Sequence, residues 1–120
     1  MTGRRLHNRS VRVKARAGRR HLGIDVQEWG GVSFEWRELV APERKGATVW
    51  SIFSGETRYF EPSTAPFMIN YRVRDLDQVL AALRAEGVEV DPRVHESEYG
   101  RFGWAMDPEG NRFELWEPPA

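Results

Sequence analysis

The chain has 120 residues, of which 40% are hydrophobic, enough for one domain with a single core. It contains no cysteine, so disulfide and thiolate chemistry are excluded, and no apolar run is long enough for a signal sequence or a membrane span. We therefore expect a cytoplasmic protein with no membrane partner. The formal net charge is +0, but the 18 basic and 18 acidic side chains are unevenly distributed.

Residues 1–22 form a basic segment with seven arginines, one lysine and no acidic residue, so the rest of the chain carries a net charge of −8. Such an arm suits a polyanion, but it lacks interleaved aromatic residues and any helical or zinc-finger pattern, so we do not expect a nucleic-acid partner. We expect an irregular segment whose arginines are solvated or lie on acidic surface, of this chain or of a partner subunit. A further alternative is that residues 1–22 are not the ancestral residues of this fold, as a frameshift or a misassigned start would produce.

Residues 23–66 contain three segments with the composition of strands, at residues 24–29, 32–37 and 48–53. They are separated by Gly30-Gly31 and by a polar run with proline and glycine over residues 41–46. Trp50 lies on the last of these segments. We expect the three segments to form the sheet of this part of the chain.

Residues 67–73 predict an alternating strand, with Ile69, Tyr71 and Val73 on one face and Met68, Asn70 and Arg72 on the other. Residues 75–87 predict an amphipathic helix that begins with acidic residues, ends at a glycine and has an apolar stripe of Leu76, Val79, Leu80 and Leu83. Residues 88–94, broken by Asp91-Pro92, suit a short edge strand.

Residues 99–118 predict a hairpin whose turn is Asp107-Pro108-Glu109-Gly110-Asn111. The expected register pairs Met106 with Arg112, Trp104 with Glu114 and Phe102 with Trp116, while Ala105 and Gly103 face Phe113 and Leu115. The small and apolar face is then covered by the helix. The face with Trp104, Arg112, Glu114 and Trp116 is the expected wall of a wet cavity, and Glu114 is where we expect chemistry.

This C-terminal part resembles the βαβββ module of the vicinal oxygen chelate superfamily, which contains glyoxalases, bleomycin-resistance proteins and ring-cleaving dioxygenases. The resemblance covers residues 67–118 and depends on the turn with the following Phe113-Glu114-Leu115-Trp116, together with Val73-Arg74-Asp75-Leu76-Asp77 at the helix start. It implies an α+β fold in which paired βαβββ modules form a U-shaped mixed sheet around a ligand and often a divalent metal, with the helices outside.

Residues 23–66 are then a partial first module. His21-Leu22-Gly23 resembles the end of the family's first helix, but residues 13–22 are too few for a strand end and a full helix, and they show no apolar stripe. We therefore expect the first module's helix to be truncated. Exposed sheet edges and a shortened module favour a homodimer.

The resemblance also implies where a metal would bind, because metal-using members take one ligand from the first and last strand of each module. Glu114 matches the last of these positions, but Met68 stands where a histidine is common, and residues 48–53 offer no carboxylate or imidazole. His7 matches the remaining position only if residues 6–13 form the first strand. Glu114 and His7 are thus the only metal-ligand candidates, and we expect no intact metal site.

We accordingly expect a small-molecule-binding protein of the bleomycin-resistance kind, without a metal. The expected ligand-binding residues are Met68, Asn70, Arg72, Trp104, Arg112, Trp116 and Trp50. The alternative is a glyoxalase-like lyase, isomerase or dioxygenase with Zn, Mn, Ni or Fe in a non-standard site, in which Glu114 is the general base and an arginine holds an anionic oxygen. Glu114 also has a structural interpretation, as a carboxylate ion-paired with Arg72 and Arg112.

Overall fold

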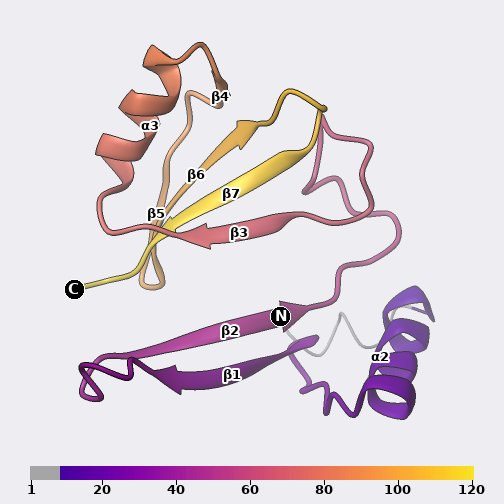
Figure 1. The fold of residues 1–120 in the computed structure, drawn as a ribbon. Coiled ribbons are helices and arrows are strands. Elements are labelled where there is room, and N and C mark those ends of the chain that lie inside the picture. The colour runs from indigo at the N-terminus through magenta and orange to yellow at the C-terminus, as the bar shows by residue number, and fades with distance from the viewer. Residues whose placement is uncertain (1–8) are drawn as a thin grey trace. The chain divides into compact units, whose positions relative to one another are not determined.

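The structure is a computed structural model that describes residues 9–120, and the chain divides into two compact units (Figure 1). The first unit, up to Thr57, contains helix α2 (Arg9–Leu22) and strands β1 (Gly31–Arg37) and β2 (Lys45–Ser51). The second unit contains β3 (Ile69–Arg72), α3 (Leu76–Ala85), β4 (Glu89–Val90), β5 (His95–Ser97), β6 (Gly100–Met106) and β7 (Arg112–Glu117). Among the described residues, no helix is both long and apolar enough to cross a membrane.

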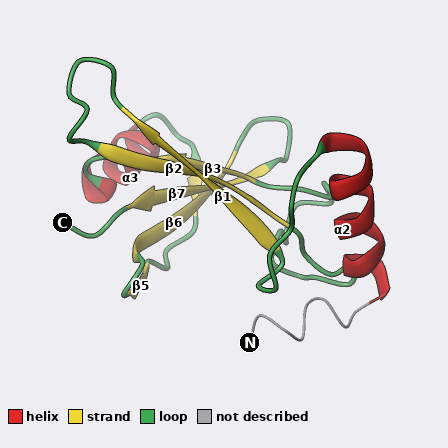
Figure 2. Cartoon of the chain, turned by 90° about the horizontal axis from the view of Figure 1, so that it is seen from below, coloured by secondary structure: helices red, strands yellow, loops and turns green. Residues whose placement is uncertain are grey.

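Helix α2 is a regular helix of 14 residues, connected to β1 by a loop (Figure 2). The expected irregular segment is therefore wrong for residues 9–22, and the helix is longer than expected. Arginine, lysine and alanine are good helix formers, and the side that packs on the unit is made of Ala15 and Gly18 rather than of a leucine stripe. A first strand over residues 6–13 is also wrong from Arg9 onward, because these residues are helical.

The core of the first unit is a small cluster around Val26 and Ile52, against which Ala15, Ile24 and Trp50 pack. Strands β1 and β2 pair antiparallel as a hairpin, with Val32 opposite Trp50. The strand expected over residues 24–29 is absent from the structure. The chain turns there instead, with the Gly30 backbone N–H donating to the carbonyl of Gln27 at 2.9 Å.

The sheet of the second unit has the strand order β3-β7-β6-β4, with β5 also paired to β6. Strands β6 and β7 are antiparallel in the register predicted from the turn, including Trp104 opposite Glu114 and Phe102 opposite Trp116. Strand β3 pairs parallel to β7, which places Asn70 beside Glu114. The predicted edge strand over residues 88–94 is the short β4, whereas β5 was not predicted.

Helix α3 covers the apolar face of this sheet, as its stripe predicts. Leu76 and Leu80 are buried against Leu115, and an added Cβ at Gly103 would lie 3.2 Å from both methyl groups of Leu80. Asp75 caps the helix by accepting from the backbone N–H of Gln78. The opposite face of the sheet is left for the polar side chains.

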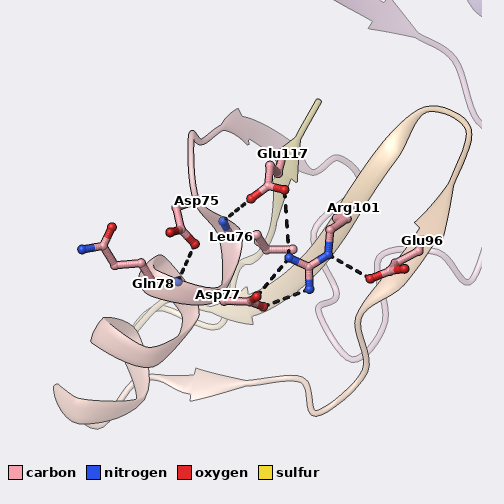
Figure 3. Close-up of polar contacts among 7 residues, drawn as sticks. All are labelled: Asp75, Leu76, Asp77, Gln78, Glu96, Arg101 and Glu117. Atoms are coloured by element: carbon pink, nitrogen blue, oxygen red, sulfur yellow. Dashed lines mark hydrogen bonds and ion pairs between the residues drawn. The ribbon is translucent and has the colours of Figure 1, made fainter. Parts of the chain in front are cut away.

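Arg101 of β6 connects the start of α3 to the strands, as Figure 3 shows. Its guanidinium donates to both oxygens of Asp77, at 2.9 and 3.1 Å, and to Glu96 at 3.0 Å, and it lies 4.0 Å from Glu117. The Glu117 carboxylate in turn accepts from the backbone N–H of Leu76 at 2.8 Å. The hydrogen bond from Arg101 lowers the pKa of Asp77 below its ordinary value.

Candidate functional site

Glu114 is the centre of the polar face, and only 7% of its surface is exposed. Three side chains donate hydrogen bonds to its carboxylate. The Asn70 amide of β3 donates to Oε1 at 2.6 Å, and the Trp104 indole N–H of β6 donates to Oε2 at 2.8 Å. The Tyr59 hydroxyl, from the segment before β3, donates to the same Oε2. Each donor is formally neutral, so the carboxylate is stabilised by dipoles and not by an opposite charge.

The structural interpretation of Glu114 as a carboxylate ion-paired with Arg112 is wrong, because the Arg112 guanidinium donates to the Glu61 carbonyl and lies 3.9 Å from Asp91 instead. Arg112 lies over the face of the Trp104 ring, with its Cζ atom 5.2 Å from the ring centroid. Trp104 thus contacts both the Glu114 carboxylate and the Arg112 guanidinium, because its indole N–H donates to the carboxylate and its ring faces the guanidinium.

Arg112 is deeply buried, with only 9% of its side chain exposed. It donates through Nη1 to the backbone carbonyl of Glu61, and its Nη2 atom lies 3.9 Å from Asp91. Its Nε atom is buried and has no hydrogen-bond partner among the described residues. A buried guanidinium with an unused donor is costly for a purely structural group.

Tyr59 is the site residue that sequence reasoning missed. The pKa of its hydroxyl is raised, first by burial and then by the hydrogen bond to Glu114, so Tyr59 stays protonated and acts as a donor. Its ring also makes an edge contact with Trp104, at 6.4 Å between centroids. Residues 58–66 have no periodic pattern, so nothing in the sequence indicated which of them meets the sheet.

The other predicted binding residues are placed as follows. Met68 is half-buried just before β3. Trp116 stacks on Phe102, with its N–H donating to the carbonyl of Tyr99 at 2.7 Å, and Arg72 lies 5.9 Å above its ring. Trp50 belongs to the first unit, where its ring lies against Gly18 and packs on the core cluster.

A divalent metal does not fit the donors that the structure brings together. A carboxylate offers about four lone-pair directions, and three of those of Glu114 already accept hydrogen bonds. Met68, which directly precedes β3, offers only a thioether, which is a poor ligand for Zn, Mn, Ni or Fe(II). Among residues 9–120, no group of three or more His, Cys, Asp or Glu side chains could hold a metal ion. His7 lies outside the described residues.

No protein-family model matches the chain, and no curated protein matches it. Among solved structures, the chain is similar to one described as an NAD-dependent benzaldehyde dehydrogenase from Legionella pneumophila, with a TM-score of 0.59, 10% identity and 90% of each chain covered. At this identity the likeness shows a shared fold alone.

Two further solved structures are a glyoxalase family protein from Enterococcus faecalis and a member of the glyoxalase/bleomycin resistance protein/dioxygenase superfamily from Sphaerobacter thermophilus. The first has a TM-score of 0.40 and 19% identity, with 84% of this chain and 86% of that chain covered. The second has a TM-score of 0.39 and 20% identity, with 88% and 86% covered. These TM-scores are too low to carry an argument.

The predicted α+β class is confirmed. The chain is an α+β protein, and its second unit has the β-α-β-β-β order implied by the resemblance, with β5 as one additional short strand.

Proposed function

We propose that the polar face of the second unit binds a small molecule and that it does so without an intact metal site. The observation that carries this proposal is the Glu114 carboxylate, buried among three neutral donors beside the buried guanidinium of Arg112. A buried carboxylate held by neutral donors costs free energy, and such arrangements concentrate at binding and catalytic sites.

The chemistry of these side chains favours a small planar anion. Arg112 supplies a positive charge with an unused donor at Nε, and the rings of Trp104 and Trp116 supply flat apolar surface. The Glu61 carbonyl now occupies the acceptor position at Arg112 that an anionic oxygen of a ligand would take. A ligand group that replaces Tyr59 beside Glu114 must, like the Tyr59 hydroxyl, donate a hydrogen bond. Binding therefore requires that residues 58–66 move aside.

The alternative is a glyoxalase-like lyase, isomerase or dioxygenase with a non-standard metal site. It is favoured by the place of Glu114 on β7, the last strand of the module, where the resemblance implies a ligand. In this alternative Glu114 is also the candidate general base, and it accepts three hydrogen bonds that hold it in one orientation. A further metal ligand would come from His7 or from a second chain.

Metal content separates the two functions. The untagged protein is incubated with Ni, Mn, Zn and Fe(II), and metal is measured by elemental mass spectrometry in the native chain, in Glu114→Gln and in Glu109→Gln. Glu109 is an exposed carboxylate of the hairpin turn and serves as the matched control. We expect no stoichiometric metal in any of the three. Stoichiometric metal that is lost only in Glu114→Gln would instead support the alternative of a metal-dependent glyoxalase-like lyase, isomerase or dioxygenase.

Ligand binding is tested by thermal shift with simple aromatic carboxylates, such as benzoate and salicylate, as probes. A ligand present at about 100 times its Kd stabilises the folded state by about 2.7 kcal/mol, which raises the melting temperature. We expect the shift to be lost in Arg112→Gln and kept in Arg84→Gln, which removes an exposed arginine from α3. An equal shift in both variants would contradict a role for Arg112.

We also propose that the protein is a cytoplasmic homodimer. Strand β3 is an edge of its sheet, and the exposed fractions of Ile69 and Tyr71 on it are 50% and 51%. An edge strand with exposed apolar side chains is a typical site of association. The mass measured by light scattering at micromolar concentration tests the dimer, and a monomeric mass would contradict it.

A further inference from the structure

The outer side of α2 carries arginines that the small-molecule site does not use. Arg12, Arg16 and Arg20 are spaced by four residues, which places them on one side of the helix. All three side chains are exposed, and they make no hydrogen bond or ion pair with any other described part of the chain. They form a line of three exposed guanidinium groups, here called the arginine stripe.

The opposite side of α2 fixes the direction in which the stripe points. Ala15 and Gly18 pack on the core of the first unit. On the flanks, Lys14 donates to the carbonyl of Phe53 at 3.1 Å, and Arg19 lies 3.5 Å from Asp25. These contacts hold the helix by its inner side, so the arginine stripe is presented outward without further ordering of the backbone.

The positive charge is concentrated on this helix. Residues 9–22 contain six basic residues and no acidic residue, whereas residues 23–57 contain three basic and six acidic residues. A partner that matches this helix must therefore be strongly negative. Residues 23–57, by contrast, are net acidic and repel such a partner.

We propose that the arginine stripe binds the phosphate backbone of nucleic acid without reading its sequence. A guanidinium forms paired hydrogen bonds with phosphate oxygens. The stripe is about 12 Å long at about 1.5 Å per residue. One DNA strand carries a phosphate about every 3.4 Å of duplex axis, so a stripe of this length spans at least three phosphates, enough for one per arginine. The absence of a visible helical pattern argued against nucleic acid at the level of sequence, and α2 removes that objection.

An anionic membrane surface fits the same charge less well. A helix that lies in a membrane interface inserts a broad apolar face beside its basic one. In α2 the small inner residues Ala15 and Gly18 are already used against the core. Its exposed large apolar residues, Val13 at 56% and Leu22 at 68%, are nine positions apart and thus on opposite sides of the helix, so they form no broad apolar face. The phosphate backbone of a nucleic acid needs no apolar insertion.

The test is fluorescence anisotropy of the full chain with a labelled duplex of arbitrary sequence, at several salt concentrations. Three neutralised phosphates give a slope of about −2.7 in log affinity against log salt, and thus a loss of about forty-fold between about 50 and 200 mM. In the variant Arg12→Gln/Arg16→Gln/Arg20→Gln we expect the slope to flatten by about that amount. Glutamine is a good helix former, so α2 is kept, and far-UV circular dichroism verifies it.

The matched control is Lys45→Gln/Arg74→Gln/Arg84→Gln, which removes three exposed positive charges outside α2. We expect this control to keep the slope and the affinity of the native chain. An equal loss in both triple variants would mean a general charge effect and would overturn the proposal. Binding to phosphatidylserine vesicles without binding to the duplex would overturn it in favour of a membrane, and no binding to either at low salt would overturn it outright.

Discussion

The contact between Leu80 and Gly103 predicts a strong coupling between two substitutions in the core of the second unit. Leu80 has 2% of its surface exposed, and an added Cβ at Gly103 would lie 3.2 Å from Cδ1 and Cδ2 of Leu80 and 3.4 Å from Cδ1 of Leu76. The helix and the sheet are thus packed as closely as this glycine allows. Each residue therefore sets the space that is available to the other.

The magnitudes follow from the atoms that are removed or added. Leu80→Ala deletes three buried carbons, which costs about 2 kcal/mol at ~0.8 kcal/mol per methylene and about 2–5 kcal/mol once the cavity is included. Gly103→Ala adds a methyl group that forces the leucines to shift by a few tenths of an ångström, at a cost of about 1–3 kcal/mol. About 0.4–1 kcal/mol of this is offset by the lower entropy of the unfolded chain.

In the double variant the new methyl group enters the space that Leu80 has left. We expect Gly103→Ala to be neutral or stabilising by up to about 1 kcal/mol in the Leu80→Ala background, which corresponds to a favourable coupling of about 1–2 kcal/mol. The free energy of unfolding is measured by urea titration for the native chain, both single variants and the double variant. Leu39→Ala is the control, because Leu39 is 99% exposed and the same atoms are removed there at almost no cost.

Two outcomes would refute this packing. Single-variant effects that add within about 0.5 kcal/mol would mean that the two residues do not share a space. A near-neutral Leu80→Ala would mean that α3 is not docked on the sheet.

Two further predictions concern polar contacts. Tyr59→Phe removes one of the three hydrogen-bond donors to the Glu114 carboxylate. Because Tyr59 is 40% exposed, we expect the free energy of unfolding to fall by about 1–2 kcal/mol. Tyr99→Phe, at a site that is 67% exposed, is the control, and equal effects of the two substitutions would contradict the contact between Tyr59 and Glu114. Asp77 has its pKa lowered from 3.8 by Arg101, so its contribution is complete above pH 3.8 and is lost as the pH falls below that value. Urea unfolding at pH 7 and in acid should therefore show a smaller loss on acidification in Asp77→Asn, and an unchanged loss would contradict the pairing.

The sequence was sufficient for the second unit wherever local rules act alone. The five-residue turn at 107–111 and the two-residue period of the strands determine the register that places Trp104 opposite Glu114. The leucine stripe and the Asp75 cap determine α3. The same alternation assigned Asn70 to one face of its own strand and Glu114 to the polar face of the hairpin, whereas only the parallel pairing of β3 with β7 places the two residues side by side.

Only the tertiary structure decided which partners the polar groups take and that residues 9–22 are helical. Tyr59 reaches Glu114 across 55 positions of sequence, from a segment with no periodic pattern, and Arg112 turns to the Trp104 ring instead of the nearby carboxylate. Helix α2 packs through Ala15 and Gly18, which leave no apolar stripe in the sequence. The physical reason is the same in both cases: periodicity reports on side chains that bury large apolar area within one element, whereas contacts made by small residues or by loop hydroxyl groups depend on what the rest of the fold places beside them.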